Sequence, residues 1–238
     1  MITIKKLTKR FGNFKAVDQL SLSVKEGEIL CLLGANGAGK STTINMLLNF
    51  INPTSGLAEI NGLDVVKNPM KTKELITYIP ENLMLYPSLT AVENLDYFSG
   101  IAGKNLSTQQ LIGFLRESGL QEHAFQKRIS TFSKGMRQKV GIALALAKDT
   151  KVLLLDEPTS GLDPKASNEF GELLQQLKNK GSAVLMATHD LFRAKEVATH
   201  IGIMKHGQMR KELEADKITL VELESSYLDM MNHKEVLS

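Results

Sequence analysis

The segment from Gly34 to Ser41, which reads Gly-Ala-Asn-Gly-Ala-Gly-Lys-Ser, constrains the fold of this chain more than any other feature. It fits the pattern G-x-x-x-x-G-K-[ST], a glycine-rich loop whose backbone N–H groups surround phosphates. The context agrees, because residues 28–33 read as an apolar strand and residues 40–48 as a helix. A helix N-terminus at this point favours a bound anion. The segment therefore predicts a strand–loop–helix unit that binds phosphate.

The polar side chains of this loop have roles that their chemistry predicts. Lys40 would reach the β- and γ-phosphates of a nucleotide, and the Ser41 hydroxyl would ligate Mg²⁺. A chance match is the alternative, and the flanking strand and helix argue against it. The predicted nucleotide-binding residues of this segment are Gly34, Asn36, Gly37, Ala38, Gly39, Lys40, Ser41 and Thr42.

Composition limits the class of protein. The chain has 238 residues, 42% of them hydrophobic and 23% charged, which is ordinary for one globular domain with a subdomain. The net charge of +3 is too small and diffuse to indicate a nucleic-acid partner. A lone cysteine, Cys31, excludes an internal disulfide and fits a reducing compartment. Neither a signal peptide nor a run of about 20 apolar residues is visible, so a partner would supply any membrane-spanning helices.

Strands and helices are predicted to alternate along the chain, which is typical of an α/β fold with a mostly parallel sheet. Residues from about 81 to 148 interrupt this alternation with a helical block, in which Thr90 and Ser107 open capping-box patterns with Glu93 and Gln110. Strands are predicted over 2–5, 20–24, 58–60, 77–79, 152–155, 183–187 and 201–204, and further helices over 164–180 and 191–198.

Three polar residues follow two of the apolar strands. Asp156 and Glu157 end the strand over 152–155, and ligands of α/β proteins bind at the carboxyl ends of such strands. Asp156 would hold Mg²⁺, directly or through water, and Glu157 would polarise an attacking water. Two solvated acids in a surface turn are the alternative. His189 follows the strand over 183–187 and could hydrogen-bond near a phosphate, although a histidine alone is more often structural.

A second potential anion site lies at Ser133-Lys134-Gly135, where the serine caps a predicted helix. By itself this segment is only a helix cap. Its position between the glycine-rich loop and Asp156-Glu157 supports its interpretation as an anion site. The order of all these motifs resembles that of the nucleotide-binding subunit of ABC transporters, over about residues 2–211. The remaining motifs of that series are Pro80-Glu81, Phe132–Met136, Leu154–Pro158, Ser160–Asp163 and Thr188–Asp190.

The resemblance implies a P-loop core with a mostly parallel sheet, a small antiparallel β-subdomain and an inserted helical subdomain over about 82–148. It places the nucleotide-binding domain at 1–211 and a short C-terminal helical extension at 212–238. It also implies an ATPase that uses ATP and Mg²⁺ and powers export through a separate membrane-spanning permease. ATP would be sandwiched between two subunits, either a homodimer or a pair with a second ATPase. The variants Pro-Glu and Ser-Lys-Gly-Met are similar to those of the ABC-2 type exporter branch.

By this resemblance, residues outside the loop also have predicted roles. Phe11 matches the aromatic residue that stacks on adenine, and His189 matches the switch histidine that acts in catalysis with Glu157 and Lys40. Glu81 stands where glutamine is common and would contact Mg²⁺ or the attacking water. Ser133 and Gly135 match the signature motif, which binds the γ-phosphate held by the opposite subunit. The loop that crosses the dimer interface is matched by Ser160, Gly161 and Asp163.

The chain departs from the family pattern at two charged positions. Lys134 replaces a glycine of the common signature and adds a cation near the incoming γ-phosphate, and Glu81 adds an anion near Mg²⁺. The roles of Glu81 and Met136 therefore stay open, and the sequence does not identify the transported substrate. The expected location is cytoplasmic, peripheral at the inner face of the cell membrane.

Two other function classes compete with the transporter subunit. A soluble ABC-type ATPase acting on DNA or ribosomes would usually carry two cassettes or a long coiled coil, and this chain shows one cassette and a small basic excess. We therefore expect no nucleic-acid partner. A non-enzymatic regulatory module would have a degenerate site, whereas Lys40, Asp156, Glu157 and His189 are all present.

Overall fold

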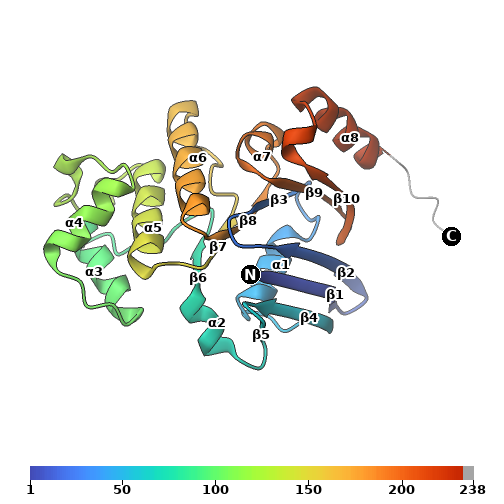
Figure 1. Ribbon diagram of the computed structural model, residues 1–238, viewed down its shortest axis with the longest axis horizontal. Coiled ribbons are helices and arrows are strands. Elements are labelled where there is room, and N and C mark those ends of the chain that lie inside the picture. The colour runs from blue at the N-terminus through green and yellow to red at the C-terminus, as the bar shows by residue number, and fades with distance from the viewer. Residues whose placement is uncertain (233–238) are drawn as a thin grey trace.

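The structure is a computed structural model that describes residues 1–232, and these residues form two β-sheets and eight α-helices (Figure 1). Residues 233–238, the end of the predicted C-terminal extension, lie outside the described part of the chain. None of the helices within residues 1–232 is long and apolar enough to cross a membrane.

The smaller sheet is antiparallel, with strand order β2-β1-β4-β5. Its strands are β1 (Ile2–Phe11), β2 (Phe14–Val24), β4 (Ser55–Ile60) and β5 (Leu63–Asp64). Strands β1 and β2 extend well beyond the predicted 2–5 and 20–24, because bulges interrupt the alternation. Lys6 and Gln19 have left-handed φ angles of 45° and 49°, and the register shifts near both. A bulge changes the direction in which the following side chains point, although the two strands remain paired. The alternation of apolar and polar residues is therefore lost in the sequence while the strand continues.

The larger sheet has the strand order β10-β9-β3-β8-β7-β6, and only β10 pairs antiparallel to its neighbour. Every residue of β3 and β8 is buried, as expected for parallel strands covered on both faces. The carboxyl ends of β3, β7 and β8 therefore lie along one edge, where the candidate site forms. The strand bounds are β3 (Ile29–Leu33), β6 (Ile76–Ile79), β7 (Val152–Asp156), β8 (Ala183–Thr188), β9 (His200–Lys205) and β10 (Gln208–Glu214).

Helices cover both faces of the larger sheet. Helix α1 (Lys40–Leu47) contacts strands of both sheets and joins them through Ile44 and Leu47, which are fully buried. The opposite face is covered by α5 (Lys134–Lys148), α6 (Pro164–Asn179) and α7 (Leu191–Val197). The other helices are α2 (Pro69–Leu75), α3 (Ala91–Ile101), α4 (Thr108–Glu117) and α8 (Leu220–Asn232).

Helices α3, α4 and α5 form a helical block with a hydrophobic cluster of its own, to the left of the sheets in Figure 1. Both predicted capping boxes are confirmed at the start of α3 and α4. At α3, the Glu93 backbone N–H donates to Thr90 Oγ1 (3.2 Å) and the Thr90 N–H donates to Glu93 Oε2 (2.7 Å). Hydrogen bonds from the Thr90 backbone and side chain to the Glu93 carboxylate lower the pKa of Glu93.

Replacing Thr90 with alanine is expected to destabilise the folded chain by about 1 kcal/mol, because the first turn of α3 loses its side-chain acceptor. Urea denaturation followed by circular dichroism measures this loss. The Thr90→Ser variant keeps the hydroxyl and is expected to stay close to wild type. Equal midpoints for Thr90→Ala and wild type would show that the capping box does not stabilise the helical block.

Candidate nucleotide-binding site

The glycine-rich loop joins the end of β3 to the start of α1, where the sequence predicts it. Gly39 forms the N-cap of α1 with a left-handed φ of 104°. A Cβ at Gly39 would lie 2.5 Å from the Ala16 carbonyl oxygen, and one at Gly34 would lie 2.5 Å from that of Met204. Both positions therefore require glycine, and the tight packing holds the loop amides around the N-terminus of α1.

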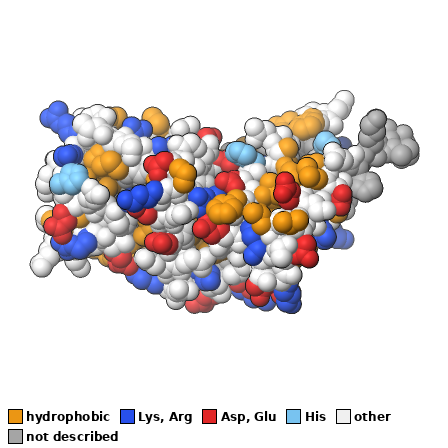
Figure 2. All heavy atoms as spheres, turned by 90° about the horizontal axis from the view of Figure 1, so that it is seen from above, with side chains coloured by type: hydrophobic (Ala, Val, Ile, Leu, Met, Phe, Trp, Pro, Cys, Tyr) orange, Lys and Arg blue, Asp and Glu red, His pale blue; other side chains and the backbone are white. Residues whose placement is uncertain are grey.

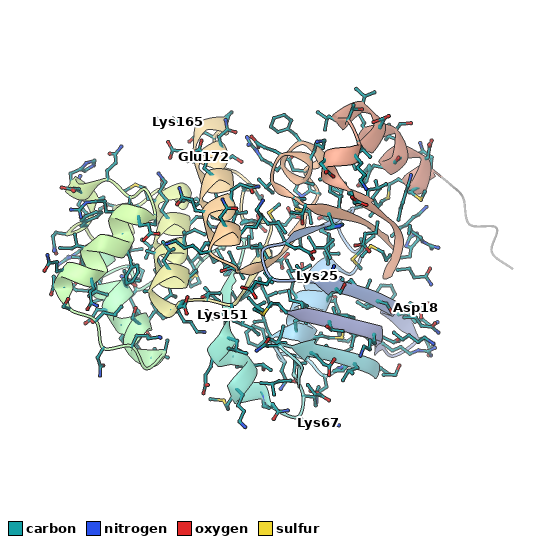
Figure 3. The ribbon with its side chains drawn as sticks, in the orientation of Figure 1. Asp18, Lys25, Lys67, Lys151, Lys165 and Glu172 are labelled. Carbon is teal, nitrogen blue, oxygen red and sulfur yellow. The ribbon has the colours of Figure 1, made fainter. Side chains whose placement is uncertain are left out.

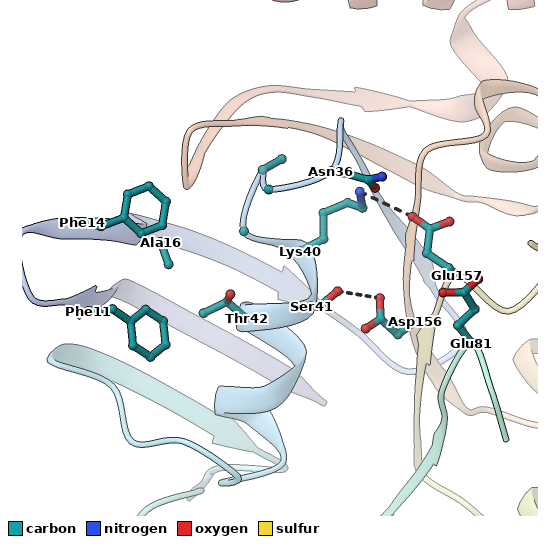
Figure 4. A pocket seen from close by; sticks show the side chains of 13 residues that line it. Phe11, Phe14, Ala16, Asn36, Lys40, Ser41, Thr42, Glu81, Asp156 and Glu157 are labelled. Carbon is teal, nitrogen blue, oxygen red and sulfur yellow. Dashed lines mark hydrogen bonds and ion pairs between the residues drawn. The ribbon is translucent and has the colours of Figure 1, made fainter. Parts of the chain in front are cut away.

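Lys40 is the one charged residue of the loop, and only 5% of its side chain is exposed. Its ammonium donates to the Gly34 carbonyl oxygen at 2.6 Å and to that of Ala35 at 3.3 Å. It also lies 3.5 Å from Glu157 Oε1 (Figure 4). A buried cation needs such partners. This arrangement keeps the ammonium beside the loop amides, so that both would interact favourably with a bound anion.

Ser41 and Asp156 are 115 positions apart in the sequence and in contact in the fold. The Ser41 hydroxyl donates to Asp156 Oδ1 at 3.0 Å. Burial raises the pKa of Asp156 and the Ser41 hydrogen bond opposes this, while the charges of Glu157 and Glu81 raise it further. No cluster of three His, Cys, Asp or Glu within residues 1–232 could hold a metal alone. The pair fits Mg²⁺, which is usually bound by one or two carboxylates together with substrate phosphates.

Glu157 lies between Lys40 and His189. Its Oε2 is 2.9 Å from His189 Nδ1, whereas its Oε1 is buried and accepts no hydrogen bond from the described residues. The Glu157 backbone has a left-handed φ of 48°, uncommon for a residue with a side chain, and its N–H donates to the Ala187 carbonyl at 2.9 Å. Strained backbone of this kind clusters at functional sites. The geometry leaves one fixed carboxylate oxygen ready to accept a proton or a hydrogen bond.

A cavity of about 340 Å³ connects these groups to two aromatic rings. Phe11 and Phe14 are cross-strand partners at the tip of the β1–β2 hairpin and remain 51% and 64% exposed. The sequence analysis assigned Phe11 and missed Phe14 and Ala16. The sequence Phe-Gly-Asn-Phe could have identified Phe14, because a two-residue turn makes the flanking aromatic residues cross-strand neighbours. The cavity is lined by Phe11, Phe14, Ala16, Asn36, Gly37, Ala38, Gly39, Lys40, Ser41, Thr42, Glu81, Asp156 and Glu157.

The other assigned residues lie outside the lining of this cavity. Ser133 caps α5 by accepting from the Met136 N–H at 3.3 Å, and Asp163 caps α6 by accepting from the Ala166 N–H at 2.9 Å. Ser160 donates to Glu81 Oε1 at 2.9 Å. Gly135 and Gly161 lie beside these caps and also line no part of the cavity. Within one subunit these residues therefore stabilise helix starts and loops, and their assignment to a second subunit stays a prediction.

Residues 17–160 match the family model described as ABC transporter, which covers more than half of the chain. The chain belongs to the ABC transporter family. It is an ATP-binding subunit of that family and an ATPase, as the order of its motifs predicts.

Two relatives of this ABC ATPase are named as ATP-binding proteins of transporters. The bacitracin transport ATP-binding protein BcrA of Bacillus licheniformis is 40% identical over 215 residues, which cover 89% of this chain and 69% of that protein. The ABC transporter ATP-binding protein NatA of Bacillus subtilis (strain 168) is 35% identical over 216 residues, with 88% and 87% covered.

Solved structures agree with the fold of this ABC ATPase. One described as an ATP-binding subunit of an ABC transporter has a TM-score of 0.83 and 30% identity and covers 95% of this chain and 99% of its own. The dimeric post-hydrolysis state of the cassette MJ0796 bound to ADP and Pi has a TM-score of 0.80 and 27% identity, with 90% and 99% covered. The predicted fold class, a mostly parallel core with an antiparallel β-subdomain and an inserted helical subdomain, is confirmed.

Proposed function

We propose that this ATPase uses Mg²⁺ and couples ATP hydrolysis to substrate export through a separate membrane-spanning permease. The observation that carries the proposal is that Lys40 and Ser41 at the start of α1, and Asp156 and Glu157 at the end of β7, line one cavity that also holds two aromatic rings. The names of the relatives BcrA and NatA, both transport ATP-binding proteins, support it. Its expected place is the cytoplasmic face of the cell membrane, as a peripheral subunit.

Each group in the cavity has one part in the reaction. Lys40 and the loop amides from Asn36 to Thr42 would hold the phosphates, and Ser41, Asp156 and Glu81 would hold Mg²⁺. When bound, the ion would neutralise charge on the transferring phosphoryl group. Glu157 Oε1 would accept the proton of the attacking water, while the His189 ring fixes the other oxygen of the same carboxylate.

A second subunit would complete the site. Ser133 and Gly135 at the start of α5, and the loop Ser160–Asp163, line no part of this chain's own cavity. In a dimer, either of two copies or with a second ATPase, they would contact the nucleotide and the interface of the opposite subunit. Contacts to the γ-phosphate would exist only in the closed dimer, so ATP would favour closure and hydrolysis would allow opening. The dimeric state of the MJ0796 cassette supports this arrangement.

The permease is proposed to dock beside the helical block. A cavity of about 510 Å³ there is lined by residues from α2, β6, α3 and α5. Large apolar side chains are exposed around it and in the loop before α3, and such patches mark interaction sites. We define these side chains as the docking rim: Phe50, Met70, Met84, Tyr86, Tyr97 and Ile101, each 44–82% exposed. Leu85, in the same loop as Met84 and Tyr86, is 7% exposed and belongs to the core of the block.

Nucleic acid is not the proposed partner. Basic and acidic side chains are interspersed over the face in Figure 2, without a continuous basic stripe. A backbone-binding surface for nucleic acid would need clustered lysines and arginines. This distribution and the net charge of +3 favour a protein partner.

Purification from detergent-solubilised membranes tests the proposal. A membrane-spanning polypeptide is expected to copurify with the wild-type chain and to be lost from the Met84→Asp and Ile101→Asp variants. The matched control is Val221→Asp, because Val221 is 74% exposed on α8, far from the docking rim. Copurification with ribosomes or DNA in place of a membrane polypeptide would contradict the proposed function.

The nucleotide base is proposed to stack on Phe11. Replacing Phe11 with alanine is expected to raise the Kd for ATP about tenfold, because aromatic stacking on a base contributes about 1–3 kcal/mol. Titration with a fluorescent ATP analogue measures this change, and Phe11→Tyr serves as the control that keeps a stacking ring. Loss of affinity in Phe14→Ala but not in Phe11→Ala would assign the stacking to Phe14.

We also propose domain limits for the chain: 1–211 for the nucleotide-binding domain, about 82–148 for its helical subdomain and 212–238 for the C-terminal extension. The separate hydrophobic cluster of α3, α4 and α5 supports the subdomain. Leu223 is fully buried where α8 packs on α7 and β9, so the described part of the extension is anchored to the domain.

A further inference from the structure

Three segments that are distant in the sequence meet at the carboxylate of Glu81. Lys134 Nζ, on the first residue of α5, lies 3.7 Å from Glu81 Oε1. The Ser160 hydroxyl, in the loop after β7, donates to the same oxygen at 2.9 Å. Glu81 itself follows β6, so the parallel core and the helical block are connected through one charged side chain.

The backbone around Lys134 is held on both sides. Ser133 caps α5 through the Met136 N–H. A Cβ at Gly135 would lie 3.3 Å from the Ala166 Cβ, so the start of α5 packs closely on the first turn of α6. With its main chain fixed in this way and 27% of its side chain exposed, Lys134 is directed toward Glu81 by the fold of the surrounding segments.

Glu81 brings a third carboxylate to a cavity that must accept a triphosphate. It lines the cavity together with Asp156 and Glu157, and its charge acts on Asp156. Lys40 is the lysine that lines the cavity, whereas Lys134 lines no part of it. Without Lys134, the charge of Glu81 would repel the phosphates, and the Ser160 hydroxyl alone would hold its carboxylate at the cavity edge.

We propose that Lys134 is a positioning residue of the nucleotide site. It pairs with Glu81, offsets the negative charge of that carboxylate and, with Ser160, keeps it at the edge of the cavity. Because Lys134 is the first residue of α5, the position of this helix also determines how far the charge of Glu81 at the cavity edge is offset when a nucleotide binds. This inference rests on the proposed function, because it assumes that the cavity binds ATP. It gives Lys134 a role within its own subunit, separate from any contact with a second subunit.

The proposal is tested by a double-mutant cycle on ATP affinity. Lys134→Met is expected to raise the Kd for ATP about three- to fivefold, the upper range for a partly exposed ion pair. In the Glu81→Gln background the same substitution is expected to change the Kd by less than about 1.5-fold, because no charge remains to offset. Lys134→Arg should stay close to wild type. The effect of Lys134→Met should shrink in about 0.5 M salt, since exposed charges are screened.

The control uses a second lysine–carboxylate pair beyond the other end of α5. Lys151 lies 2.8 Å from Asp149, and both are exposed and line no part of the cavity (Figure 3 labels Lys151). Lys151→Met and Asp149→Asn are expected to leave the Kd unchanged. Melting temperatures of all variants, measured without nucleotide, separate a change in binding from a change in folding.

Each alternative result has a defined meaning. Equal weakening by Lys134→Met in both backgrounds would mean that Lys134 contacts the phosphates directly, and would overturn the positioning role. An unchanged Kd in Lys134→Met would overturn it as well. A wild-type chain that binds no ATP would overturn the proposed function, and this inference with it.

Discussion

The Lys40→Ala variant is expected to lose ATP hydrolysis, with kcat reduced by about a thousandfold. Lys40 is the cation at the centre of the cavity, 5% exposed and held between the loop carbonyls and Glu157. Removing one preorganised group that stabilises transition-state charge typically costs about 10²–10³ in kcat. Here the loss would also leave Glu157 without its cation, which adds repulsion toward the phosphates. Steady-state release of phosphate measures the effect.

Two controls make this result specific. Lys67→Ala removes an exposed lysine in the loop before α2, 80% exposed (Figure 3), and is expected to hydrolyse ATP like wild type. The melting temperature of Lys40→Ala reports whether the loop still folds, because the Gly34 carbonyl loses its donor. A folded Lys40→Ala variant that keeps a substantial share of wild-type turnover would remove Lys40 from the catalytic assignment.

Much of the core was predictable because its signals are local. Strands β3 and β8 are buried on both faces and therefore read as continuous apolar runs. The helix starts at Thr90, Ser107 and Ser133 were predicted from cap residues whose hydrogen bonds span three positions. The glycine-rich loop was found in the same way, since its sequence pattern lies within eight residues.

Features that depend on distant segments were not predicted. Helix α2 has seven residues with Thr72 as its buried position, so it carries no periodic apolar pattern. The bulges at Lys6 and Gln19 arise from strand pairing. Because they interrupt the alternating pattern, more than half of β1 was not predicted from the sequence.

The site shows the same division between local and distant signals. Its motif residues were recognised singly, but the Lys134–Glu81–Ser160 contact joins two loops and the start of α5, which no local spacing relates. Likewise, the left-handed backbone of Glu157 occurs where its N–H donates to Ala187 on the neighbouring strand, a pairing that local sequence does not indicate. The sequence therefore predicted individual site residues, and only the fold could show which of their side chains contact one another.

The Glu157→Gln variant is expected to bind ATP but to hydrolyse it about 10²–10⁴-fold more slowly, the range for loss of a general base. Glutamine has nearly the same shape, and its side-chain oxygen can keep the contact with His189. Its amide cannot accept a proton, so the group that replaces Oε1 no longer activates water. Single-turnover hydrolysis measures the chemical step without the contribution of product release.

Because hydrolysis is the step proposed to open the dimer, Glu157→Gln should also accumulate as an ATP-bound dimer. Size-exclusion chromatography is expected to show a dimer with ATP and a monomer with ADP, while wild type returns to monomer as ATP is consumed. Glu172→Gln, a change at an exposed position of α6 (Figure 3), should behave as wild type. Normal hydrolysis by Glu157→Gln would exclude Glu157 as the base. Slow hydrolysis without a dimer would keep Glu157 as the base and contradict the proposed closure by ATP, so the two measurements test the chemistry and the movement separately.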